Sequence, residues 1–143
     1  LGYVEGERLL EPFDAVGWFA TGDLGEVDTD GWLHVTGRKD NRFISGGENV
    51  QPEAIEAALT ALPDVAQAIV VSVSDEEFGQ RPVAFVQMVD DTAPDAAALQ
   101  EALADTLPRF MWPVAMYPWP AHPDGMKPDR RALCAEAERL IQK

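Results

Sequence analysis

The loop that ends at Lys127 carries the side chain best suited to chemistry. The chain has only three lysines, Lys39, Lys127 and Lys143, and Gly125 permits a sharply turned, exposed backbone just before Lys127. A flexible ammonium group on such a loop can contact a carboxylate and a phosphate together and stabilise the charge between them. The alternative is a solvated surface lysine, which is the commoner situation for a lysine taken without context.

Two further charged residues lie in turns that contain glycine. Asp23 ends the turn Thr21-Gly22-Asp23, where its carboxylate can accept hydrogen bonds from two ribose hydroxyls or from its own backbone. Arg38 follows Gly37, and its guanidinium group can reach a phosphate or a ribose, or remain solvated. Each residue type suits a nucleotide, and each also has an ordinary structural explanation.

The segment Ser45-Gly46-Gly47 is another candidate for ligand contact. Two adjacent glycines let the backbone approach a ligand closely and adopt positive φ angles. An ordinary hairpin turn is the more frequent use of an isolated Gly-Gly pair. The motif taken alone therefore favours a turn over a site.

Charge and residue spacing exclude several classes of function. The chain has 11 Lys and Arg against 25 Asp and Glu, a net charge of −14, and nucleic-acid binding requires a basic face. His34, His122 and Cys134 have no partners at metal-ligand spacing, which argues against a zinc site. No residue context suggests a Ser-His-Asp arrangement.

The single cysteine and the apolar runs indicate the setting of the protein. Cys134 cannot form an internal disulfide, which favours a reducing cytoplasm. No apolar run approaches the roughly 18 residues of a membrane span, and no signal peptide is evident. The chain begins with Leu1 rather than Met, so we expect a piece of a longer protein.

The pattern of apolar residues predicts an α+β fold. Residues 1–36 are expected to form strands and turns, with Asp30-Gly31 as the tight turn of a hairpin over 26–35. Beyond residue 40 the pattern predicts the order βαββαβα, a mixed sheet flanked by helices. Three helices are expected: one that starts at Pro52, one over 95–107, and one that starts after a capping Asp129. The expected strands cover 65–73, 82–89 and 114–117, with a polar loop at 74–80 between the first two.

Taken together, four motifs resemble the adenylate-forming, AMP-binding superfamily of acyl-CoA synthetases, peptide-synthetase adenylation domains and luciferases. They occur in order along the whole chain: Trp18–Asp23, Gly37–Asp40, Ile44–Glu53 and Gly125–Lys127. The chain looks like the end of the large N-terminal domain of such an enzyme, residues 1–39, followed by its small mobile C-terminal domain, residues 40–143. The expected fold is therefore that lid domain preceded by a β-hairpin remnant of the larger domain.

Within the superfamily the chain is most similar to the o-succinylbenzoate–CoA ligases of menaquinone biosynthesis. The similarity lies in residues 1–3, 43–53 and 77–84, in Arg109-Phe110 and in Pro113-Val114. The chain departs from the family pattern at Pro128, where relatives usually have a small or aliphatic residue after the lysine. A proline removes a hydrogen-bond donor and stiffens the loop, which affects the pose of Lys127.

The resemblance implies a ligase that uses ATP and CoA in two steps, with Mg²⁺ bound to ATP outside this segment. Lys127 would be the catalytic residue of adenylate formation, and Asp23 and Arg38 would hold the ATP ribose and phosphate. Ser45, Gly46 and Gly47 would line the passage of pantetheine, and Asp40 with Lys39 would form the hinge.

The implied partners are the missing N-terminal domain and a small carboxylic acid, with no nucleic acid, no membrane span and an unknown oligomeric state. An isolated chain of this kind is expected to be inactive. Two alternatives remain open: another acyl- or aryl-CoA synthetase of the same superfamily, and a stand-alone, non-catalytic binding domain.

Overall fold

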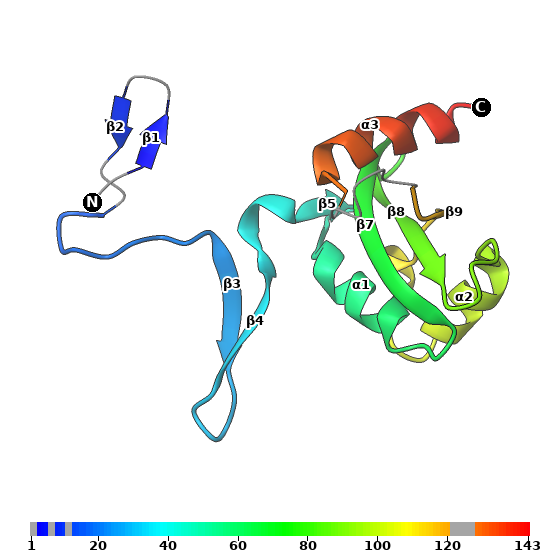
Figure 1. The fold of residues 1–143 in the computed structure, drawn as a ribbon, viewed down its shortest axis with the longest axis horizontal. Coiled ribbons are helices and arrows are strands. Elements are labelled where there is room, and N and C mark those ends of the chain that lie inside the picture. Colours follow the sequence, from blue (N-terminus) through cyan, green and yellow to red (C-terminus); the bar gives the residue numbers. More distant parts are fainter. Residues whose placement is uncertain (1–2, 6–7, 11–12, 121–127) are drawn as a thin grey trace. The chain divides into compact units, whose positions relative to one another are not determined.

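The chain folds as two units, residues 1–40 and residues 41–143. The computed structural model describes residues 3–5, 8–10, 13–120 and 128–143. Lys127 therefore lies outside the described residues. Figure 1 labels the helices and strands of the two units.

The described part of the first unit contains two pairs of antiparallel strands and an isolated bridge between Phe13 and Phe19. Strands β1 (Tyr3–Glu5) and β2 (Arg8–Leu10) pair antiparallel, and so do β3 (Asp23–Val27) and β4 (Leu33–Arg38). The last pair of the second ladder is Val27 with Leu33, so residues 28–32 form a five-residue loop. The expected tight turn at Asp30-Gly31 is instead part of this longer loop, which is held by hydrogen bonds from the Asp30 and Trp32 amides to the Asp28 carboxylate and from the Gly31 amide to the Asp28 carbonyl.

Large apolar side chains of the first unit are exposed. They include Trp18 at 76%, Trp32 at 72% and Val35 at 67% of their full accessible area. Both faces of a two-stranded ribbon are open, and two strands are too few to enclose a core. The first unit accordingly owes its shape to backbone pairing and turns rather than to packing.

The second unit has the element order ββαββαβα. After a short 3₁₀ segment, η1 (Lys39–Asn41), the strands are β5 (Phe43–Ser45), β6 (Glu48–Val50), β7 (Val65–Asp75), β8 (Gly79–Met88) and β9 (Ala115–Pro118). The helices are α1 (Pro52–Thr60), α2 (Ala96–Leu103) and α3 (Arg130–Ile141), with a second 3₁₀ turn, η2 (Arg109–Met111), before β9. The expected α+β class is confirmed; one strand was expected before α1, and the structure has two.

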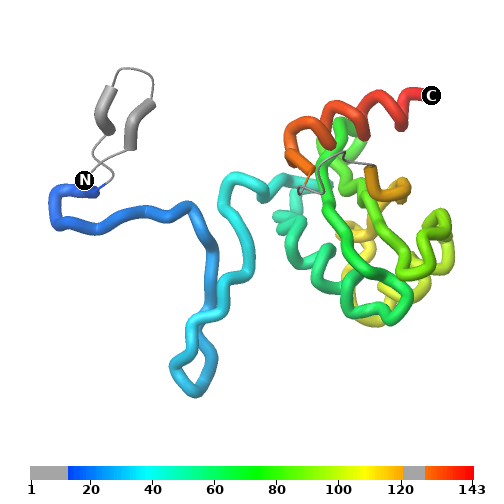
Figure 2. The backbone as a smooth tube through the Cα atoms, in the orientation of Figure 1, coloured from blue at the N-terminus to red at the C-terminus, as the bar shows by residue number. Residues whose placement is uncertain are grey.

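The five strands form one mixed sheet in which β8 is central. Strand β7 pairs antiparallel with one side of β8, and the tube in Figure 2 follows the chain from β7 back along β8. On the other side, β5 pairs antiparallel at Ser45–Gly79, and β9 pairs parallel along Val83–Val86. The β7–β8 ladder continues to Asp75–Gly79, so the polar loop expected at 74–80 contracts to residues 76–78.

The alternation of side chains along β7 and β8 divides the core into two layers. Val70, Ala84 and Val86 face one layer, into which α1 and α2 pack with Ile55, Leu59, Leu99 and Leu103. Ile69, Val71, Val83 and Phe85 face the other layer, which α3 covers with Leu133 and Ala137. Figure 1 shows α1 and α2 on one side of the sheet and α3 on the opposite side.

Helix ends follow the local signals of the sequence. Pro52 occupies the start of α1, and the carboxylates of Asp95 and Asp129 accept hydrogen bonds from the first amides of α2 and α3. The helix expected over 95–107 ends at Leu103, where the Ala104 amide donates to the Glu101 carbonyl three residues back and the chain turns through residues 104–107. In the part of the chain that is described, no helix is both long and apolar enough to cross a membrane.

Candidate functional site

Asp23 and Arg38 meet at one end of the β3–β4 ladder, where they are direct register partners. Arg38 Nη1 donates to Asp23 Oδ1 at 3.2 Å and to the Thr21 carbonyl at 3.0 Å. Gly22 has a φ of +80°, and a Cβ at that position would lie 3.0 Å from Arg38 Nη2. The glycine therefore leaves room for the guanidinium group beside the turn.

This corner keeps acceptor and donor groups in reach of a ligand. The Asp23 and Arg38 side chains are 40% and 48% exposed. A carboxylate oxygen can accept hydrogen bonds from hydroxyl groups, and a guanidinium group is a donor that pairs with oxyanions. The arrangement can hold a diol beside an anionic group, which is the combination that a nucleotide presents.

Gly46 and Gly47 form the two-residue turn of the β5–β6 hairpin. Ser45 pairs with Glu48 across the turn, and the φ angles of the two glycines are +58° and +86°. Positive φ at both central positions is the geometry of a type I′ hairpin turn. The Gly46 amide also donates to the carbonyl of Phe78 at 2.9 Å, which fixes the turn on the loop between β7 and β8.

The two glycines differ in the space around them. A Cβ on Gly46 would lie 3.0 Å from the Phe78 ring, whereas a Cβ on Gly47 would meet no atom of the described residues within 4 Å. Ser45 is buried, with 2% of its area exposed. The open side of the turn is therefore at Gly47.

Hydrogen bonds hold the chain on either side of Asp40. The Lys39 amide donates to the Gly22 carbonyl at 2.8 Å, and Arg38 Nη2 lies 3.7 Å from Asp40 Oδ2. Asn41 begins the second unit, and its side-chain amide donates to Glu53 Oε1 at 2.6 Å. The unit boundary thus falls between Asp40 and Asn41.

The chain that follows Lys127 is anchored in the second unit. Pro128 is buried and Asp129 caps α3. Arg130 Nη1 donates to Glu56 Oε1 at 2.7 Å and to the Val70 carbonyl at 2.5 Å, while the Val70 amide donates to the same Glu56 oxygen at 2.8 Å. A single ion pair therefore joins α3, α1 and the outer edge of β7.

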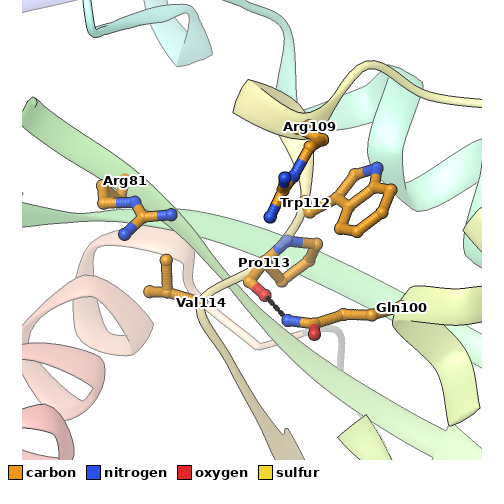
Figure 3. A pocket seen from close by; sticks show the side chains of 6 residues that line it. All are labelled: Arg81, Gln100, Arg109, Trp112, Pro113 and Val114. Atoms are coloured by element: carbon orange, nitrogen blue, oxygen red, sulfur yellow. Dashed lines mark hydrogen bonds between the residues drawn. The ribbon is translucent and has the colours of Figure 1, made fainter. Parts of the chain in front are cut away.

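Sequence reasoning missed a cavity of about 320 Å³ next to β9. Its lining, shown in Figure 3, consists of Arg81, Gln100, Arg109, Trp112, Pro113 and Val114. The guanidinium carbon of Arg109 lies 5.6 Å from the centre of the Trp112 ring, and Gln100 donates to the Pro113 carbonyl at 2.5 Å. The sequence offered one signal for this cavity: Arg81 and Arg109 are two of only 11 Lys and Arg residues in the chain.

Asp28 and Cys134 are among the ionisable groups outside these sites whose pKa values are shifted. The hydrogen bond from His34 and the amides of the 28–32 loop lower the pKa of Asp28. Burial raises the pKa of the Cys134 thiol, which keeps it protonated and a poor nucleophile. Among the described residues, no three His, Cys, Asp or Glu side chains gather to bind a metal ion.

Comparison with known proteins identifies the family. Residues 54–124 match the model of the AMP-binding enzyme C-terminal domain. The chain is 43% identical over 134 residues to a 2-succinylbenzoate–CoA ligase of Salmonella typhimurium, covering 92% of this chain and 29% of the relative. It is 41% identical over 113 residues to a sulfoacetate–CoA ligase of Cupriavidus necator, covering 78% of this chain and 22% of the relative.

A solved structure shows the same relationship. An arginine-to-lysine variant of E. coli MenE with bound OSB-AMS has a TM-score of 0.84 and 40% identity, over 97% of this chain and 30% of that one. The chain thus spans about three tenths of the length of the Salmonella ligase and of this MenE variant. It belongs to the AMP-binding family of adenylate-forming enzymes and carries the C-terminal domain of that family.

Proposed function

We propose that the chain is part of an ATP-dependent acid–CoA ligase that acts on o-succinylbenzoate. The observation that carries the proposal is the Asp23–Arg38 corner, a preassembled site for a diol and an anion. It occurs in a chain 43% identical to part of a 2-succinylbenzoate–CoA ligase. Residues 1–39 would be the end of the large adenylation domain, and residues 40–143 its mobile lid domain.

In the first half-reaction, a carboxylate oxygen of the acid attacks the α-phosphorus of ATP. A bond forms between that oxygen and phosphorus, and pyrophosphate leaves with the electrons of the broken P–O bond. Asp23 would accept hydrogen bonds from the ribose hydroxyls while Arg38 orients the Asp23 carboxylate. Lys127 would bridge the attacking carboxylate and the α-phosphate, and Mg²⁺ would neutralise the remaining phosphate charge from outside this segment.

In the second half-reaction, the CoA thiolate attacks the acyl carbon and AMP leaves. The turn at Gly46 and Gly47 would border the path of the pantetheine arm, a role that the open space at Gly47 supports. The lysine is not needed in this step, so the lid domain would rotate about Asp40 and Lys39 between the two steps. Basic residues beside that hinge would attract the phosphates of CoA.

Sulfoacetate is a second candidate for the acid substrate. The sulfoacetate–CoA ligase covers 78% of this chain at 41% identity, so the segment alone does not separate the two acids. Both acids carry a second anionic group besides the carboxylate that reacts. The residues that distinguish them would lie in the acyl pocket of the larger domain.

The decisive experiment uses the full-length enzyme that contains this segment. Acid-dependent exchange of pyrophosphate into ATP should occur with o-succinylbenzoate and be far weaker with sulfoacetate, and thioester should form when CoA is added. The 143-residue chain alone should catalyse neither step. If no carboxylic acid supports exchange, the proposal is contradicted and a non-catalytic binding domain is favoured.

A further inference from the structure

Two polar contacts, here called tethers, flank Asp40, and each holds the chain to a different unit. On the first side, the Lys39 amide is bonded to the Gly22 carbonyl, inside the unit of residues 1–40. On the second side, the Asn41 side chain is bonded to Glu53 in the first turn of α1, inside the unit of residues 41–143. Asp40 is the residue between the two tethers.

Glu53 is well placed to act as the second tether. Its Oε1 accepts from Asn41 at 2.6 Å and its Oε2 accepts from Gln51 at 2.5 Å, and the three side chains are half-buried. A carboxylate in the first turn of a helix is favoured by the helix dipole, and charged acceptors make stronger hydrogen bonds than neutral ones. The next residues are held by the core, because Phe43 is buried and pairs with Val50.

We propose that Glu53 is a positioning residue that confines domain rotation to Asp40, by fixing Asn41 to α1. The inference rests on the proposed two-step reaction, in which the lid domain changes orientation. A hinge is a short stretch whose dihedral angles absorb the change, and its length depends on how close the flanking anchors are. Without the Glu53 contact, the dihedral angles of Asn41 and Arg42 can share the rotation.

The test is a double-mutant cycle in the full-length ligase, with single-turnover rates of adenylate formation and thioester formation. Asp40→Pro fixes φ at the pivot, so it should slow one half-reaction about tenfold more than the other. Combining it with Glu53→Ala should restore the slowed step by about tenfold, the scale on which neighbouring residues couple. A merely structural role for Glu53 would make the double variant worse, not better.

Matched variants distinguish the loss of the Asn41–Glu53 hydrogen bond from a general loss of stability. Asn41→Ala removes the same hydrogen bond from the other partner and should restore the slowed step equally, so it decides the matter if Glu53→Ala fails to fold. Glu53→Gln keeps an oxygen acceptor for Asn41 and should restore less. Glu101→Ala removes an exposed glutamate of α2 and should restore nothing.

Two outcomes would overturn the inference. In one, the effects of Asp40→Pro on the rates simply add to those of Glu53→Ala and of Asn41→Ala, with no restoration of the slowed step. In the other, Asp40→Pro slows adenylate formation and thioester formation by the same factor. Failure of the proposed function would look different, since the unmodified enzyme would then show no acid-dependent pyrophosphate exchange.

Discussion

The two units of the chain hold their shapes by different means. Residues 1–40 expose most of their described large apolar side chains and rely on backbone pairing, turn glycines and the Arg38–Asp23 pair. Residues 41–143 bury two layers of aliphatic side chains against the faces of one sheet. The contrast suggests that the second unit can be stable by itself, whereas the first has too little buried area to offset its loss of conformational entropy.

The contrast extends to function. The first unit presents Asp23 and Arg38 in fixed register on one ladder, and we propose that this corner serves ATP throughout the reaction. The second unit carries Gly47 and Lys127, whose proposed roles belong to different half-reactions. A layered core gives such a unit the rigidity to move as one body.

The largest expected effect tests the difference in packing. In the 143-residue chain, Leu103→Ala removes a fully buried side chain and should lower the free energy of unfolding by about 2–5 kcal/mol. Val35→Ala, at a position 67% exposed, should change it by less than about 0.5 kcal/mol. Urea unfolding followed by circular dichroism measures both, and similar losses at the two sites would contradict the contrast between the units.

The next effect concerns the chemistry assigned to the second unit. In the full-length ligase, Lys127→Ala should slow adenylate formation by about 10²–10³, the scale for losing one preorganised charge-stabilising donor. Transfer from preformed adenylate to CoA should change far less. Asp23→Ala, in the first unit, should instead raise the KM for ATP, and equal loss in both half-reactions for Lys127→Ala would refute the division of roles.

A smaller effect is expected at the turn of the β5–β6 hairpin. Gly47→Leu should slow thioester formation by about tenfold while pyrophosphate exchange survives, because the new side chain enters the open space beside the turn. Gly47→Ala carries the same strain at a φ of +86° with a much smaller side chain, so it controls for the backbone. If alanine and leucine impair the step equally, Gly47 is needed for the turn and not for the passage of CoA.

The smallest effect lies in the loop of the β3–β4 hairpin. The pKa of Asp28 is lowered from its ordinary value of 3.8, chiefly by the hydrogen bond with His34. A lowered pKa means that the carboxylate stabilises the loop above the ordinary value, and that this support disappears as the pH falls through the lowered one. The indole resonance of Trp32 should therefore shift at acid pH, and Asp28→Asn should abolish that titration while it leaves the second unit unchanged.

Short-range features of the fold could be predicted from the sequence. Pro52 starts α1 and Asp129 caps α3 as expected, because a cap depends on a few neighbouring residues. The apolar runs at 65–73 and 82–89 likewise indicated β7 and β8. The motifs around Asp23 and Arg38 indicated two residues that the β3–β4 register brings together. The family membership followed from the same ordered motifs.

Only the tertiary structure decided which distant residues meet. The cavity between Arg81 and Arg109 depends on residues far apart in the sequence. So does the contact of Asn41 with Glu53, 12 positions apart, which neither residue type announces. Capping and periodicity act within a turn or two of backbone, whereas pairing and burial are set by the whole fold, and no local pattern specifies them.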